Sequence, residues 1–64
     1  MQTLKGWRYR INGLRADFEQ SHNGAYLATL HSANGREYLC GAVLTTANEC
    51  KRFLWDRAQA YNAR

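Results

Sequence analysis

The dipeptide Asn12-Gly13 constrains the fold of this chain more than any other feature of its sequence. A two-residue type I′ turn needs positive φ at both central residues, and Asn followed by Gly tolerates that conformation well. Apolar and charged residues alternate on both sides of the dipeptide, in the stretch YRINGLRADF at positions 9–18. The pattern therefore predicts a β-hairpin in which Trp7 faces Phe18.

Two further turns extend this hairpin into a larger sheet. The segment SHNGA predicts a three-residue loop at positions 22–24, which is a common hairpin connection when its last residue is Gly. Asn34-Gly35 predicts a second two-residue turn, which would place Leu30 opposite Leu39. We therefore expect an antiparallel meander whose strands cover about residues 5–11, 14–20, 25–32 and 37–44.

Side chains alternate along a strand, so this register sorts the residues into two faces. It places Tyr26 opposite Val43 and puts Gly41 on the inner face, where it would let a helix approach closely. The inner face is expected to be apolar and to contain Trp7, Tyr9, Ile11, Leu14, Ala16, Phe18, Tyr26, Ala28, Leu30, Leu39 and Val43. The outer face is expected to contain Arg8, Arg10, Arg15, Asp17, Glu19, Leu27, Thr29, His31, Tyr38, Cys40 and Ala42.

The segment from about 47 to 62 reads as an amphipathic helix. Thr46 followed three residues later by Glu49 is typical of a capping box at a helix N-terminus. Apolar residues recur with helical spacing and form one stripe, which contains Ala47, Cys50, Leu54, Ala58 and Tyr61. A helix that covers the apolar sheet face gives a single two-layer α+β domain over residues 1–64, with the element order β-β-β-β-α.

The chain is basic, with nine Lys and Arg residues against five Asp and Glu, a net charge of +4 and a pI near 9.5. Seven of the nine cations are Arg, whose planar fork matches phosphate better than Lys does. One interpretation of the outer face is an ordinary solvated surface. The other is a duplex-binding surface, because arginines hold phosphates while a sheet or ribbon enters the major groove. The predicted nucleic-acid-binding residues are Arg8, Arg10, Arg15, Arg36, Thr29, His31 and Tyr38.

The segment NGAYLATLHSANGREYLCGAVLTTANECKRFLWDRAQAY resembles the layout of AP2-type and integrase arm-binding domains. The shared features are an aromatic strand, a hairpin that runs to a Thr cap, and a helix bearing alanines and aromatics. The resemblance implies three antiparallel strands with a helix behind them, and duplex DNA bound by the sheet face. This chain departs from the pattern because its arginines lie mainly on the extra N-terminal hairpin.

A second functional hypothesis is a small protein that binds and modulates another protein, like the accessory proteins of phages and mobile elements. Its contact surface would be an apolar patch on the outer face, formed by Leu27, Tyr38, Cys40 and Ala42. The exposed edge of the first or fourth strand offers a second route, because an unpaired edge can accept an added strand. A homodimer could form in either way.

Other chemistry is not favoured by the sequence. His31 and Cys40 would be diagonal neighbours on the outer face, but no third group is apparent to orient a Cys–His pair. The spacing of His22, His31, Cys40 and Cys50 lacks the close pairs that are typical of structural zinc sites. We therefore expect no enzyme activity, no metal, no cofactor and no small-molecule substrate. No apolar leader or membrane segment is apparent, so we expect a cytoplasmic protein with reduced cysteines.

Overall fold

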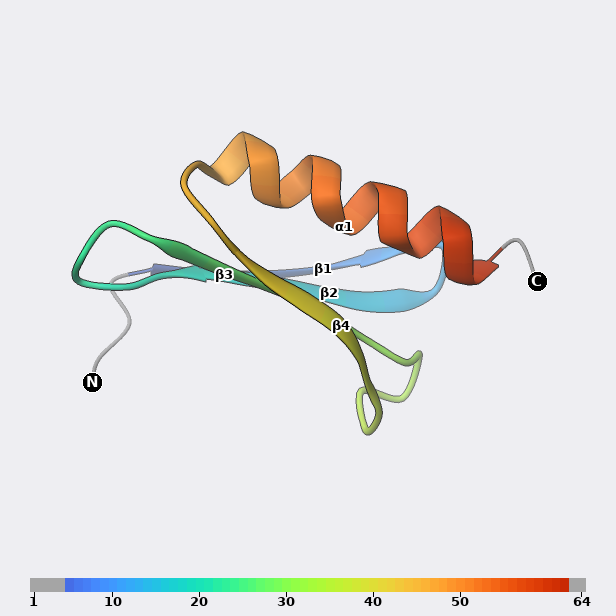
Figure 1. The fold of residues 1–64 in the computed structure, drawn as a ribbon. Coiled ribbons are helices and arrows are strands. Elements are labelled where there is room, and N and C mark those ends of the chain that lie inside the picture. The colour runs from blue at the N-terminus through green and yellow to red at the C-terminus, as the bar shows by residue number, and fades with distance from the viewer. Residues whose placement is uncertain (1–4, 63–64) are drawn as a thin grey trace.

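The computed structural model describes residues 5–62 and has the predicted architecture of a four-stranded antiparallel sheet with one helix on one face (Figure 1). The strands lie in the sheet in chain order, and their bounds fall within one residue of those predicted. The elements are β1 (Lys5–Ile11), β2 (Leu14–Gln20), β3 (Tyr26–His31), β4 (Tyr38–Leu44) and α1 (Ala47–Asn62).

The β1–β2 hairpin forms as the Asn-Gly dipeptide predicts. Asn12 and Gly13 have φ values of 52° and 84°, as a type I′ turn requires. Trp7 lies opposite Phe18, and their rings stack with centroids 4.7 Å apart. The first half of the sheet therefore has the predicted register and the predicted inner face.

The β2–β3 connection is also confirmed as a three-residue loop. Ser21 N–H donates to the Ala25 carbonyl at 2.9 Å, and Gly24 has a φ of 88°. The side chain of Asn23 closes the turn, because its Oδ1 accepts bonds from the Ser21 hydroxyl and, at 3.0 Å, from Ala25 N–H. The register that follows places Phe18 opposite Ala28, as predicted.

The predicted two-residue turn at Asn34-Gly35 is wrong. Ser32 N–H donates to the Glu37 carbonyl at 2.9 Å, so four residues lie between the paired strand ends. Of the dipeptide, only Gly35 has positive φ, at 76°. The cause is the Asn34 side chain, whose Oδ1 accepts bonds from the Ser32 hydroxyl at 2.6 Å and from Arg36 N–H at 2.9 Å. The same Ser-x-Asn-Gly motif shapes both turns of this half of the sheet.

A β-bulge at Leu39 changes the rest of the β3–β4 register. His31 pairs with Tyr38, but Leu30 pairs with Cys40 rather than with Leu39, so Leu39 is the extra residue. Its carbonyl accepts a hydrogen bond from the Tyr61 hydroxyl at 3.1 Å. The helix therefore supplies a partner for a group that the bulge removes from the ladder.

The bulge reverses the predicted facing of β4. Cys40 and Ala42 lie opposite Leu30 and Ala28 on the inner face, so their predicted place on the outer face is wrong. The predicted pairing of Tyr26 with Val43 is likewise wrong, since Tyr26 pairs with Leu44. Val43 instead lies on the outer face and is 71% exposed.

Gly41 also lies on the outer face, opposite Thr29, and not under the helix as predicted. A Cβ at this position would lie 2.5 Å from the Tyr38 hydroxyl and 2.9 Å from the Ala28 carbonyl oxygen. Glycine is thus needed here for the close packing of the outer face, because a carbonyl in the sheet cannot move aside as a side chain can.

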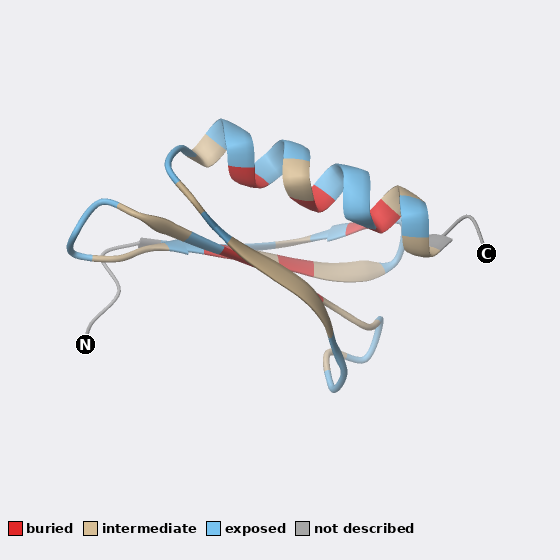
Figure 2. Ribbon diagram, viewed as in Figure 1, coloured by how far each residue is buried: buried red, intermediate tan, exposed pale blue. Residues whose placement is uncertain are grey.

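The core lies between β2, β3 and the middle of α1 (Figure 2). Cys50, Leu54 and Ala58 are fully buried, which confirms the predicted helix stripe. The sheet contributes Ile11, Ala16, Phe18, Ala28 and Leu30. The helix packs mainly on β3 and least on β1, so the inner face of β1 keeps an uncovered margin.

Two threonines and a glutamate fix the start of α1. Thr46 Oγ1 accepts a bond from Glu49 N–H at 3.1 Å, which confirms half of the predicted capping box. The Glu49 carboxylate reaches past Thr46 to Thr45, where it accepts bonds from the hydroxyl at 2.6 Å and from N–H at 3.1 Å. These donors stabilise the charged form and lower the pKa of Glu49.

Candidate functional site

Asp17 organises the charged half of the outer face. Its carboxylate oxygens lie 3.0 Å from Arg8 Nε and 3.4 Å from Arg15 Nε, and 3.8 Å from His31 Nε2. The contact with Arg8 is a hydrogen bond, whereas Arg15 Nε is buried and has ion-pair distance without hydrogen-bond geometry. A single carboxylate therefore holds two guanidinium groups in place while it offsets one of their charges.

Arg10, which the sequence predicts as a nucleic-acid contact, has hydrogen bonds to two turns. Its Nη1 donates to the Gly13 carbonyl at 3.0 Å and to the Ala33 carbonyl at 2.8 Å. These bonds tie the β1–β2 turn to the β3–β4 turn, which extends from the side of the sheet opposite α1 (Figure 1). Arg10 is thus a positioning residue for the second turn.

The β3–β4 turn contains a third arginine, Arg36, and contacts the side chain of Arg15. A Cβ at Gly35 would lie only 2.6 Å from Arg15 Nη1, so the Arg15 side chain passes directly against this turn. Arg36 is the next residue and is exposed. We use the term arginine face for the surface formed by Arg8, Arg15 and Arg36.

The remaining residues predicted for nucleic-acid binding form a second cluster on the same face. His31 Nε2 lies 3.3 Å from Thr29 Oγ1, and the His31 ring packs edge-on against Tyr38 with centroids 5.9 Å apart. Tyr38 is 62% exposed. Because His31 also approaches Asp17, this cluster is contiguous with the arginine face.

The apolar patch of the protein-binding hypothesis has different members from those predicted. Leu27 and Tyr38 are exposed, but the third exposed residue is Val43, which pairs across the strands with Leu27. Cys40 packs against the core, and burial raises the pKa of its thiol. His31 and Cys40 consequently lie on opposite faces of the sheet. We use the term outer patch for Leu27, Tyr38 and Val43.

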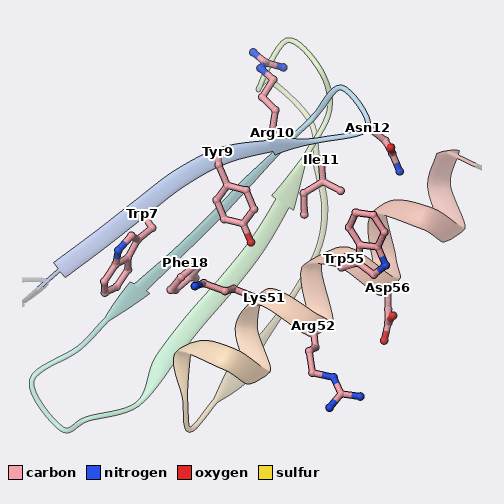
Figure 3. Close-up of a pocket in the computed structure, with 10 residues that line it drawn as sticks. All are labelled: Trp7, Tyr9, Arg10, Ile11, Asn12, Phe18, Lys51, Arg52, Trp55 and Asp56. Atoms are coloured by element: carbon pink, nitrogen blue, oxygen red, sulfur yellow. The ribbon is translucent and has the colours of Figure 1, made fainter.

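A groove between β1 and α1 was missed by sequence reasoning. It has a volume of about 790 Å³, and both tryptophans of the chain line it. Trp7, Tyr9 and Phe18 form its sheet side, and Lys51 and Trp55 extend into it from the helix (Figure 3). Trp7 is 38% exposed and Trp55 is 55% exposed. The available signal was Trp55, a large aromatic just outside the buried stripe of the helix. We use the term aromatic groove for this site.

The rim of the aromatic groove is polar on its helix side. Arg52 and Asp56 lie there with Lys51. Arg10 lines the groove on its β1 side, and its side chain points away from the helix (Figure 3). Burial raises the pKa of the Tyr9 hydroxyl, with a smaller contribution from Cys50. This hydroxyl is therefore neutral at physiological pH.

Within residues 5–62, no group of three or more potential metal ligands is present. Both cysteines are free thiols. In the same part of the chain, no helix has the length and apolar character needed to cross a membrane.

Comparison with protein-family models, with curated proteins and with solved structures found no match to this chain. The layout resemblance to AP2-type and integrase arm-binding domains stays a prediction. The functional proposals below therefore depend on the geometry of the site itself.

Proposed function

We propose that the chain is a non-enzymatic module that binds duplex nucleic acid with the arginine face. The observation that carries this proposal is the bend of the β3–β4 turn to the helix-free side, where Arg10 holds it through the Ala33 carbonyl. Arg36 belongs to this turn and is exposed, so we infer that its guanidinium group reaches the same ligand as Arg8 and Arg15. A projecting turn beside a sheet surface suits a nucleic-acid groove, because the turn can enter it while the sheet contacts the backbone.

The state of the Arg8 guanidinium group supports contact with phosphates. Arg8 uses Nε for Asp17, and its side chain is 67% exposed, so both terminal nitrogens can donate outward. A fork that is already oriented loses less entropy when it binds an anion. The hydroxyl groups of Thr29 and Tyr38 lie next to this surface as hydrogen-bonding groups. In the resemblance to AP2-type domains, the sheet face is likewise the DNA-binding surface.

The test is fluorescence anisotropy of a labelled duplex of roughly 20 base pairs at several salt concentrations. With two or three phosphate contacts, we expect the logarithm of affinity to fall with the logarithm of salt with a slope of about −2 to −3. The double variant Arg8→Glu, Arg36→Glu should lose binding by at least about tenfold. No binding at low salt would refute the proposal.

A matched control distinguishes binding by a defined surface from attraction by the net charge of the protein. The double variant Arg52→Glu, Arg57→Glu makes the same change in net charge, but both residues lie exposed on α1, behind the sheet. We expect this variant to retain most of its affinity. Equal losses in the two double variants would show that only the overall charge of the protein attracts the duplex, and the proposal would fail.

The outer patch favours a second candidate, a homodimer that forms through the helix-free face. Leu27 and Val43 are directly paired and both exposed, and Tyr38 adds a third apolar surface nearby. Exposed apolar side chains that gather on one face are typical of an interaction site. The change Val43→Lys should then give a monomer in light scattering at a concentration where the parent chain is a dimer. A parent chain that is monomeric at millimolar concentration would remove this candidate.

A further inference from the structure

We propose that the free edge of β1 and the aromatic groove together bind an extended peptide strand of a partner protein, with acidic and apolar residues in alternation. This site does not rest on the proposed nucleic-acid function. It lies mainly on the groove side of β1 and shares one residue, Arg8, with the arginine face. The proposal is built from the edge, the groove, and the pattern of charge along β1.

The first step is the edge itself. Among the described residues, β1 pairs only with β2, so alternate N–H and C=O groups of β1 point away from the sheet. The aromatic groove runs along the inner face of the same strand, between β1 and α1 (Figure 3). An added strand would thus find main-chain partners at the edge, and a place for every second side chain in the groove.

The second step is the apolar character of the inner positions. Trp7 is covered on one side by Phe18, at a centroid distance of 4.7 Å, but remains partly open toward the groove. Trp55 projects from the helix over the same space and is more than half exposed. Burying such rings on binding is strongly favourable, and they are typical anchors of interfaces. The inward residues of the partner strand should therefore be apolar.

The third step is the charge of the outward positions. Arg8 and Arg10 occupy the outer face of β1. Asp17 lies directly opposite Arg8 on β2 and accepts a hydrogen bond from it. A strand on the other side of β1 would bring its own outward residue next to Arg8, where an acidic side chain is favourable. Lys51 and Arg52, with Asp56, add a net positive charge on the helix rim.

The same argument disfavours a second copy of this chain as the occupant. Pairing of β1 with β1 of another copy would bring Arg8 and Arg10 of both chains together along one face. Like charges at opposed cross-strand positions are destabilising. An acidic partner strand avoids this repulsion, so a peptide of opposite charge is the better match to this edge.

The probes are an array of capped octapeptides that alternate Glu or Asp with Phe, Leu or Val, and the same array with Lys in place of the acids. Tryptophan fluorescence reports binding directly, because both tryptophans of the chain line the groove. We expect members of the acidic array to bind at least about tenfold more tightly than their Lys counterparts, and N-methylation of alternate peptide amides to abolish binding. Absence of any binding in the acidic array, or equal binding of both arrays, would overturn the proposal.

Two variants locate the site, and a swap tests the charge pairing. Trp55→Ala should weaken binding at least about tenfold. Tyr38→Ala removes a similarly exposed aromatic from the opposite face and should have no effect. Arg8→Glu should reverse the preference, so that the Lys array binds more tightly. Each variant is checked for native circular dichroism. A thymidine oligonucleotide that binds the groove in competition with the peptides, with greater affinity, would instead assign the groove to single-stranded nucleic acid and overturn the proposal.

Discussion

Replacement of Arg10 by Ala tests whether this side chain ties the two turns together. The substitution removes two hydrogen bonds, of 3.0 and 2.8 Å, to carbonyls that belong to different turns. The side chain is exposed, so each bond is worth about 0.5–1 kcal/mol, at the lower end of the usual range. We expect the free energy of unfolding to fall by about 1–2 kcal/mol. For a chain of this size, the melting temperature should fall by roughly 7–15 °C.

The matched control is Arg8→Ala, which makes the same change in net charge. Arg8 is 67% exposed and has one ion pair with Asp17, and surface pairs of this kind contribute about 0–1 kcal/mol. Thermal unfolding followed by circular dichroism should therefore show a larger effect for Arg10→Ala. In amide hydrogen exchange, Arg10→Ala should also increase exchange at Ser32 and Gly35, whose N–H groups bond within the β3–β4 turn. Equal melting temperatures for the two variants would refute the positioning role.

Three further predictions test the bulge, the facing of β4 and the start of the helix. Tyr61→Phe leaves the Leu39 carbonyl without its 3.1 Å donor and should lower the free energy of unfolding by about 1–2 kcal/mol, measured by urea denaturation; no change would mean that the bond contributes nothing. Cys40 and Cys50 should both react slowly with iodoacetamide at neutral pH, because burial raises the pKa of each thiol, and rapid alkylation of Cys40 would contradict its inner-face position. The pKa of Glu49 is lowered in the folded chain, so its contribution to the free energy of unfolding is complete above the ordinary carboxyl pKa and disappears as pH falls through the lowered value. Glu49→Gln should therefore be less stable than the parent at pH 7 and equal to it in strong acid. A stability difference that is the same at both pH values would exclude this contribution.

The first half of the fold could be predicted from sequence because several local signals agree. The Asn12-Gly13 dipeptide fixes a turn, and apolar and charged residues alternate cleanly on both sides of it. A register slip of one residue would expose every apolar side chain of this hairpin, so the correct pairing is strongly favoured. The helix could be predicted equally well, since its buried residues recur with helical spacing and a capping threonine precedes them.

The facing of β4 could not be predicted in the same way. Its sequence, YLCGAVL, is apolar or small at almost every position, so the alternation rule does not distinguish the two registers. The choice depends on contacts from distant parts of the chain. The bulge at Leu39 is compatible with the fold because Tyr61, 22 residues later, donates to the freed carbonyl. As a result, Val43 belongs to the outer patch in place of Cys40 and Ala42.

The aromatic groove could not be predicted from the sequence for a related reason. Helical periodicity identifies which stripe of a helix is buried, but it does not tell where the helix axis crosses the sheet. In the structure α1 lies mainly over β3, so Trp7 on β1 keeps part of its ring uncovered, although the alternation pattern places it correctly on the inner face. The position of the helix therefore converts a predicted core residue into a member of a candidate binding site.

The two proposed sites share β1, and this has a consequence for how they would act together. Side chains alternate along the strand, so Arg8 belongs to the arginine face while Trp7 and Tyr9, its immediate neighbours, line the groove. Both proposed ligands bring negative charge toward Arg8, the duplex through its phosphates and the peptide through its acidic side chains. Each ligand would therefore offset the positive charge that attracts the other, at a distance of a few ångströms, where screening by salt is incomplete. The two proposals together imply antagonistic binding, in which an acidic partner strand releases the module from nucleic acid.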